Sequence, residues 1–390
     1  MKCIFLTFSF PLNKAGLFYS THNRIIHTIP FLSKYTIYNI QFYDSWLLKI
    51  LKSIIGIPYV KKGSKSFYFE NLKYENIWLR RRLFSAVTSW GRFEPLRFHK
   101  LFCNEFYMSN YRIKILLKKA KDFDYISSHW GYPNGSLAMK ISKIIKKPYF
   151  VTYHGSDINT IPNKNIVFKQ IMTNVIQSAS ANFMVSEALL KKQKKLVRNS
   201  QSVVSYNGIN KELIRINCVK KNKIIFIGNL NDDKRADAIP EIIKKIYSKT
   251  NIKISFTIIG TGKYEKFIKK QLSNIKYNVN FLNQIPNNEV INNLLDSKIL
   301  ILPSRREGLP LVILEAIASK TIPVAANVGG LSEILEDEFL VNNSVNFIDD
   351  FADRVVHFLK NNNLPTLNIN DFRWENILKE EMKIITKHVR

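Results

Sequence analysis

Glu307 and Glu315, with seven residues between them, are the residues of this chain whose type and spacing most suggest chemistry. Glu307 comes shortly after Ile299–Pro303, an apolar run typical of a buried strand, and Glu315 lies in an apolar segment with helical spacing. The pattern predicts that Glu307 lies at the carboxyl end of a parallel strand and that Glu315 lies about two turns along the next helix.

A helix N-terminus is therefore expected between the two carboxylates. Its free backbone N–H groups would suit a phosphate, while a carboxylate accepts hydrogen bonds from sugar hydroxyls. The apolar neighbours of Glu315 predict a partly buried carboxylate that needs partners, and a ribose diol would supply two. Together these groups suit a nucleotide-diphosphate sugar. The residues expected beside its diphosphate are Gly308, Leu309, Pro310 and Leu311.

Short apolar runs alternate with helical segments over most of the chain, which predicts two doubly wound α/β domains in series. A length of 390 residues also exceeds one ordinary core. The expected strands are 3–8, 36–42, 125–128, 149–153, 183–185, 203–205, 223–227, 255–259, 279–282, 299–302 and 322–325. The expected helices are 240–248, 263–272, 289–295, 309–319 and 349–360, and residues 208–221 form the linker.

Positive charge is concentrated in the first half of the chain. Residues 1–219 hold 34 Lys and Arg against 10 Asp and Glu, whereas residues 220–365 hold 20 against 16. A codon bias toward Lys would act on both halves, so it does not explain the difference. The asymmetry predicts an anionic partner for the first half, which is a membrane surface, a phosphate-bearing acceptor or nucleic acid.

Segment 43–121 interrupts the α/β alternation and shows no clear series of strands. Within it, residues 46–55 have helical spacing, with Leu and Ile on most sides and Lys49 and Lys52 on one side. Such a helix suits either an ordinary domain surface or a membrane interface. The segment holds 17 Lys and Arg against 5 Asp and Glu over residues 41–121. The basic residues expected on a membrane or acceptor face are Lys49, Lys52, Arg80, Arg81 and Arg82.

Several other classes of protein are disfavoured by the sequence. No run of 18 apolar residues is present, so no spanning helix is expected, and residues 1–10 read better as a first strand than as a signal peptide. Three widely spaced cysteines fit a reducing cytosol. The acidic pairs Asp232-Asp233 and Asp349-Asp350 are adjacent residues on turns rather than spaced ligands, so no metal site and no cofactor are expected.

The second half resembles glycosyltransferase family 4, retaining enzymes with the GT-B fold. The resemblance extends through 258–264, 283–290, the two glutamates, 321–334 and 372–377, the last of which resembles the family's closing helix. It implies two Rossmann-like domains facing a cleft, residues 1–210 for the acceptor and 220–365 for the donor, with 366–390 crossing back to the first domain. It also implies that Glu307 contacts the donor sugar and stabilises the transition state.

Weaker matches in the first half follow the same family order. Residues 127–135 resemble a conserved segment, and His154 at a strand end resembles the histidine that the family places beside the donor sugar. In the first loop, where the family has two glycines, only Gly16 is present for close phosphate approach. His129 fits a structural role better.

The diphosphate-binding cations are where the chain departs from the family. The family has an Arg directly after a strand glycine and a Lys five residues further on. Here Gly228 is followed by Asn229, Lys234 fits the lysine, and Arg235 stands where the family has glycine. Arg235 is a candidate replacement for the missing charge.

The sequence therefore predicts a retaining glycosyltransferase that uses a UDP- or GDP-linked sugar without a metal. The acceptor is expected to be a glycan or a lipid-linked glycan for a surface polysaccharide or lipopolysaccharide, and the enzyme to lie on the cytoplasmic face of an anionic membrane. A nucleotide-sugar epimerase of the same fold is the enzymatic alternative. A nucleic-acid-binding protein is the alternative from another class, although no RNA-binding or zinc motif supports it.

Overall fold

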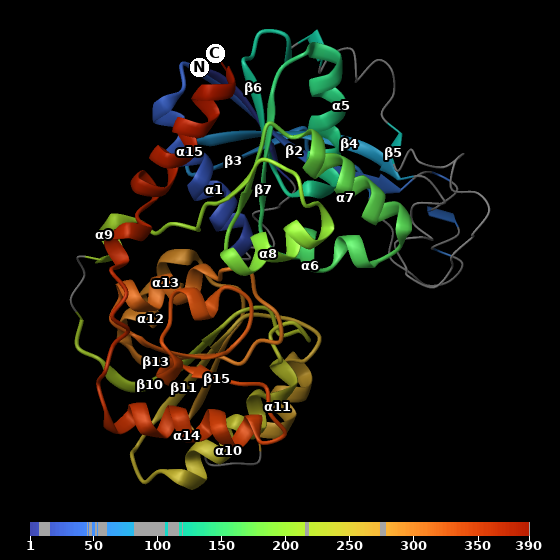
Figure 1. The fold of residues 1–390 in the computed structure, drawn as a ribbon. Coiled ribbons are helices and arrows are strands. Elements are labelled where there is room, and N and C mark those ends of the chain that lie inside the picture. Colours follow the sequence, from blue (N-terminus) through green and yellow to red (C-terminus); the bar gives the residue numbers. More distant parts are fainter. Residues whose placement is uncertain are drawn as a thin grey trace.

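The structure is a computed structural model of the whole chain. It describes residues 1–7, 16–44, 46, 49–50, 53, 61–81, 106–107, 117–118, 120–214, 218–273 and 278–389, and the statements below concern those residues. They form two α/β units, one above the other in Figure 1, and each unit is built on its own sheet of mostly parallel strands.

The first sheet comes from the first half of the chain. Its strands lie in the order β3-β4-β2-β1-β6-β7-β8-β9, and all its neighbours are parallel except β3 and β5, which pair antiparallel with β4. The strands are β1 (Lys2–Thr7), β2 (Lys34–Asp44), β3 (Ser66–Phe69), β4 (Leu72–Arg81), β5 (Phe106–Tyr107), β6 (Tyr125–His129), β7 (Tyr149–Tyr153), β8 (Ala181–Met184) and β9 (Ser202–Val204). The helices are α1 (Gly16–Thr28), α5 (Ser136–Ile145), α6 (Ser156–Asn159), α7 (Ile166–Ser178), α8 (Glu187–Leu196) and α9 (Lys211–Ile214).

The second sheet comes from the second half and is parallel throughout, in the order β12-β11-β10-β13-β14-β15. This is the order of a doubly wound nucleotide-binding sheet, and its direction of winding reverses between β10 and β13. The strands are β10 (Lys221–Ile227), β11 (Ser255–Ile259), β12 (Val279–Leu282), β13 (Ser297–Leu302), β14 (Ile322–Ala326) and β15 (Leu340–Val341). The helices are α10 (Ile239–Lys249), α11 (Glu265–Leu272), α12 (Asn287–Asp296), α13 (Leu311–Ala318) and α14 (Phe347–Lys360).

The last helix, α15 (Trp374–Val389), returns to the first half, as expected for residues 366–390. It lies beside α1 at the top of Figure 1, near both chain ends. Met382 and Ile385 pack into the core cluster that contains Cys3 and Phe5. The buried carboxylate of Glu381 accepts hydrogen bonds from Arg24 of α1 and from Ser205. The C-terminal helix is therefore part of the first core.

Segment 43–121 contains strands, which corrects the expectation that it has no strand series. β3 and β4 form a hairpin whose two turn residues, Glu70 and Asn71, both have positive φ, 42° and 66°. β4 lies beside β2 in parallel register and extends the sheet. Alternation of buried Leu72 and Tyr74 with exposed Lys73 was the available signal, but the turn lacks the glycine that usually marks such hairpins.

Candidate active site

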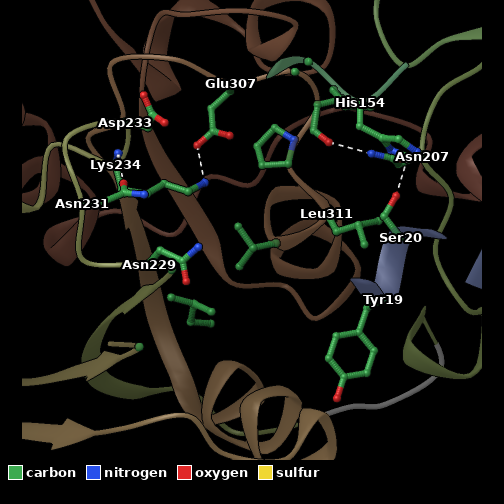
Figure 2. Close-up of a pocket in the computed structure, with 18 of the residues that line it drawn as sticks. Tyr19, Ser20, His154, Asn207, Asn229, Asn231, Asp233, Lys234, Glu307 and Leu311 are labelled. Carbon is green, nitrogen blue, oxygen red and sulfur yellow. Dashed lines mark hydrogen bonds and ion pairs between the residues drawn. The ribbon is translucent and has the colours of Figure 1, made fainter. Parts of the chain in front are cut away.

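A pocket of about 390 Å³ lies between the two halves of the chain. It opens where the ends of β7, β10 and β13 meet, which is the edge of a doubly wound sheet at which ligands usually bind. Figure 2 shows Tyr19, Ser20, His154 and Asn207 from the first half around the same space as Lys234 and Glu307 from the second. Its lining includes these residues expected from the sequence: His154, Lys234, Glu307, Gly308, Leu309, Pro310, Leu311 and Glu315.

Glu307 and Lys234 form an ion pair inside the pocket. The Nζ of Lys234 lies 2.5 Å from Oε1 of Glu307, and the side chains are 21% and 9% exposed (Figure 2). Glu307 follows β13, and Lys234 lies in the loop after β10, so the reversal of winding between these adjacent strands brings the two together. The sequence placed both at the donor site but did not indicate that they bind one another.

Glu315 lies on α13 and faces the pocket, as the spacing from Glu307 predicted. Removal of its carboxyl group from water raises its pKa to about 7. Among the residues that the structure describes, none forms a hydrogen bond or an ion pair with this carboxyl group. The carboxyl group of Glu315 thus has no bonded partner among the described residues, and it lies beside an open pocket.

His154 follows β7 and forms a hydrogen bond with His129, the last residue of β6. Nδ1 of His129 is 3.2 Å from Nε2 of His154. Burial lowers the pKa of His154 to about 3 and lowers that of His129 well below its usual value, so both rings are neutral at pH 7. The turn after His154 is held by buried Asp157, which accepts hydrogen bonds from the backbone N–H groups of His154 and Gly155 at 3.2 and 2.9 Å. His129 therefore orients His154, which is a structural role.

Close backbone packing joins the two halves at the pocket. A Cβ atom at Gly308 would lie 2.6 Å from the carbonyl oxygen of His154, and one at Gly329, where φ is 64°, would lie 2.2 Å from that of Glu307. Glycine at 308 allows the start of α13 to approach the end of β7 directly. The backbone carbonyl of His154 thus lies at the pocket beside the residue that follows Glu307.

Several residues of the first half line the pocket without having been predicted as site residues, and Tyr19, Ser20 and Asn207 are among them. The hydroxyl of Ser20 donates to Oδ1 of Asn207 at 2.8 Å, and Nδ2 of Asn207 donates to the carbonyl of Leu309 at 2.9 Å (Figure 2). Tyr19 of α1 lines the same pocket (Figure 2). The Asn-Gly pair at 207–208 was a signal for a turn only, and nothing in the sequence marked Tyr19.

The structure places Arg235 away from the pocket. Its guanidinium lies 3.9 Å from the ring centroid of Phe347 on α14, and its Nη2 donates to Asn343 at 2.5 Å. Its backbone is left-handed, with φ of 49°, a conformation that favours glycine and that fits the glycine of the resembled family. Asn229 does line the pocket. In this conformation the expected replacement of charge by Arg235 is not made.

Arg306 is a further cation of the site that the sequence analysis did not identify. It lies directly before Glu307 and lines the pocket together with Asp233, whose Oδ1 is 2.5 Å from its Nη2. Sequence reasoning passed over it because an Arg-Arg pair before a glutamate is ordinary on a solvated loop. Its position in the pocket depends on the sharp turn after β13, which no local motif predicts.

None of the remaining expected residues is among the described residues that line this pocket. Gly16 is the first residue of α1. Arg80 and Arg81 end β4, where they pair with Tyr43 and Asp44 of β2, and Lys49 is helical. Lys52 and Arg82 lie outside the described residues. Of the helix expected over 46–55, the described Trp46 and Ile50 are 71% and 43% exposed.

Two kinds of feature are absent from the described ranges. No helix there is both long and apolar enough to cross a membrane. No group of three or more His, Cys, Asp or Glu side chains there could hold a metal ion.

Comparison with known proteins agrees with this arrangement. Residues 212–370 match the family described as glycosyl transferases, group 1. An uncharacterized glycosyltransferase of Methanocaldococcus jannaschii is 26% identical over 358 residues, which cover 87% of this chain and 98% of that protein. The putative teichuronic acid biosynthesis glycosyltransferase TuaC of Bacillus subtilis is 28% identical over 223 residues, 54% of this chain and 55% of TuaC.

Among solved structures, HepE of Anabaena in complex with UDP has the same fold over 99% of this chain and 100% of its own, with a TM-score of 0.69 and 15% identity. The sheet order, the pocket between two doubly wound halves and the returning helix α15 are the features of the GT-B fold. Residues 212–370 thus match the group 1 glycosyl transferases, and the protein is a glycosyltransferase with the GT-B fold.

Proposed function

We propose that this protein is a retaining glycosyltransferase of family 4 that takes its sugar from a nucleotide-diphosphate donor. The observation that carries the proposal is the set of groups in one pocket, with Lys234 and the start of α13 next to Glu307 and with Glu315 lacking a partner. HepE, which has this fold, was crystallised with UDP. The diphosphate lies against Lys234 and the α13 N-terminus, and the ribose hydroxyls donate to Glu315.

The chemistry follows from where charge develops. As the bond between sugar and diphosphate breaks, negative charge grows on the leaving phosphate, and Lys234 with the helix N-terminus stabilises it most at that stage. The carboxylate of Glu307 and the carbonyl of His154 face the sugar, on which positive charge develops. The acceptor attacks from the side of the leaving group, and the leaving phosphate takes its proton, so configuration is retained without a protein base. These groups supply the charge without a metal or cofactor.

A screen of sugar donors tests the proposal. UDP-, GDP- and ADP-sugars are added to the protein, and the donor that raises the melting temperature is then used in a transfer assay. Proton NMR of the first product gives its anomeric configuration, which is retained if the mechanism holds. An inverted product would disprove retention, and conversion of the free donor without transfer would point to an epimerase. Activity that persists in EDTA is expected, and its loss would disprove metal independence.

The proposed acceptor is lipid-linked, in the assembly of a surface polysaccharide or lipopolysaccharide on the cytoplasmic face of the membrane. The support is the basic excess of the first half, the basic segment 41–121 and the exposed side chains of Trp46 and Ile50. TuaC, similar over half of this chain, is named for teichuronic acid biosynthesis. Each Lys or Arg near an anionic surface contributes about 1 kcal/mol, so a few together give reversible binding.

Vesicle co-sedimentation tests this location. Binding should require anionic lipid, should fall in high salt, and should weaken when Arg80, Arg81 and Arg82 become Gln. A control variant changes Lys244, Lys245 and Lys249 on α10 of the second half, which removes the same charge from the other domain. Equal weakening by both variants would show general charge attraction, and no binding at low salt would point to an acceptor in solution.

A further inference from the structure

We infer that Arg306 is the second cation for the donor diphosphate, taking the place of the arginine that the resembled family has at position 229. The inference rests on the proposed function, because it assumes that a nucleoside diphosphate enters this pocket. Arg306 contributes charge from the turn after β13, opposite the loop after β10 that carries Asn229 and Lys234. The diphosphate is thus held from both sides of the point where the sheet reverses.

The first argument is the charge of the pocket. Among the residues that the structure describes, its lining holds two Lys or Arg side chains, Lys234 and Arg306, against the carboxyl groups of Asp233, Glu307 and Glu315. Lys234 is already paired with Glu307. A nucleoside diphosphate brings at least two negative charges and cannot be balanced by one shared ammonium group. Arg306 is the other positive charge among these described lining residues.

The second argument is that position 229, where the resembled family has an arginine, carries no charge in this chain. Asn229 lines the pocket but carries no charge, and Arg235 is directed onto Phe347 and Asn343. Neither of these two residues therefore places positive charge in the pocket. Arginine has the flat, forked geometry that binds two phosphate oxygens at once, which suits a substitute for the absent arginine.

The third argument is how Arg306 is held. Its backbone is fixed, because the carbonyl of Asp233 accepts hydrogen bonds from the N–H groups of Arg305 and Arg306 at 2.7 and 3.4 Å. Its side chain is 56% exposed and bonds only one oxygen of Asp233. The guanidinium therefore has donors left for a phosphate, and Asp233 keeps it at the rim of the pocket.

Calorimetric titration with UDP and GDP, each beside its monophosphate, tests the inference. Arg306→Gln should raise the dissociation constant of the preferred diphosphate about 10–100-fold, as for loss of a charge-assisted hydrogen bond. Its effect on the monophosphate should be smaller, because fewer phosphate oxygens are available to it. Arg305→Gln is the matched control, since Arg305 is the preceding arginine, pairs with Asp237 and does not line the pocket.

Three further variants separate the explanations. If Arg306 only neutralises Asp233, adding Asp233→Asn to Arg306→Gln restores the affinity, and this result would overturn direct contact. If Arg306→Gln behaves as Arg305→Gln while Lys234→Ala weakens binding, Arg306 is not a ligand and the proposed donor site stands. If wild-type protein binds neither nucleoside diphosphate, the proposed function fails and this inference with it. Asn229→Arg should recover part of the affinity lost in Arg306→Gln.

Discussion

The ammonium group of Lys234 and the carboxylate of Glu307 bind one another at 2.5 Å in the pocket. The proposed reaction uses them separately, Lys234 on the diphosphate and Glu307 on the sugar. The ion pair keeps both side chains in place and gives each charge a partner. When the donor enters, the ion pair between Lys234 and Glu307 is replaced by a contact of Lys234 with the diphosphate and a contact of Glu307 with the sugar. Because both side chains are already ordered, this exchange costs little conformational entropy.

Glu307→Gln should lower turnover without weakening nucleotide binding. The amide keeps the shape of the carboxylate but removes the charge that faces the developing positive sugar, so a loss of about 100-fold or more is expected. Lys234 is released at the same time, so the dissociation constant of UDP or GDP should stay equal or fall. Steady-state kinetics and calorimetry measure the two effects. A near-wild-type rate would remove Glu307 from the catalytic residues.

Donor affinity should depend on pH through Glu315. Its pKa of about 7 means that it is largely protonated below that pH, while the proposed ribose contact needs the carboxylate as acceptor of two hydroxyl hydrogens. Affinity should therefore fall as pH decreases from 8 to 6, with a proton released on binding. Burial raises the pKa of Asp157 to about 6, so this residue titrates in the same pH range. The pH profile of the wild type is therefore compared with that of Glu315→Gln. An unchanged pH profile in that variant would exclude Glu315.

The same raised pKa affects stability with a definite sign. Between its ordinary value of 4.5 and about 7, folded protein binds a proton at Glu315 that unfolded protein does not. The contribution of Glu315 to the free energy of unfolding therefore decreases as pH rises through this window. Glu315→Gln should remove this slope in urea unfolding measured from pH 5 to 8. A slope that persists unchanged would assign it to other groups.

Glu333 should hold the two halves in the arrangement seen here. Its carboxylate, from the second half, accepts hydrogen bonds at 2.7 Å from the backbone N–H groups of Glu187 and Ala188, the first residues of α8 in the first half. Glu333→Gln removes the charge that favours a helix N-terminus. Faster amide hydrogen exchange in the first turn of α8 and a higher KM for the donor are expected.

Glu336→Gln is the control for that experiment. Glu336 also accepts from a backbone N–H group, that of Thr366 at 2.8 Å, but both residues lie in the second half. Its replacement should leave exchange at α8 unchanged. If Glu333→Gln and Glu336→Gln give the same exchange pattern, Glu333 does not act between the halves.

Arg235→Gln should lower stability, because Arg235 stacks on Phe347 and bonds Asn343. A cation–π contact at a partly exposed site contributes about 0.5–1 kcal/mol. Arg235→Gly loses the same contacts but gains from its left-handed backbone, so its free energy of unfolding should lie above that of Arg235→Gln. Urea unfolding of the three proteins measures this order. The reverse order would mean that the positive φ carries no strain.

Sequence reasoning predicted correctly which strand Glu307 follows and which helix carries Glu315, but it did not predict the directions of the arginine side chains. The apolar run before Glu307 and the spacing to Glu315 fix which strand end and which helix carry them, and the structure confirms both positions. Arg235 and Arg306 could not be assigned in this way. Which of two arginines enters a pocket depends on backbone dihedrals and on distant partners, here Phe347 for one and Asp233 for the other.

The central strands of the fold could be predicted from their apolar sequences, whereas the strands at the edge of the first sheet could not. Strands such as β7 and β11 have the predicted bounds, because parallel strands buried on both faces read as largely apolar runs. β3 and β4 lie at the edge of the first sheet, where one face meets solvent and the residues alternate. A ten-residue strand such as β4 then carries as many polar as apolar residues and resembles a loop.

The pairing of Arg24 with Glu381 has a consequence for the order in which the chain matures. Domains generally fold from the amino end while synthesis continues at about 5–20 residues per second. Arg24 is separated from its counter-charge by 357 positions, so it waits roughly 20–70 seconds for Glu381 to be made. During that interval the donor domain can complete itself, while the first domain keeps an uncompensated charge in its core. The first domain is therefore synthesised first but completes its core last. A chain that ends before α15 leaves Arg24 without its counter-charge, which exposes the first domain to degradation.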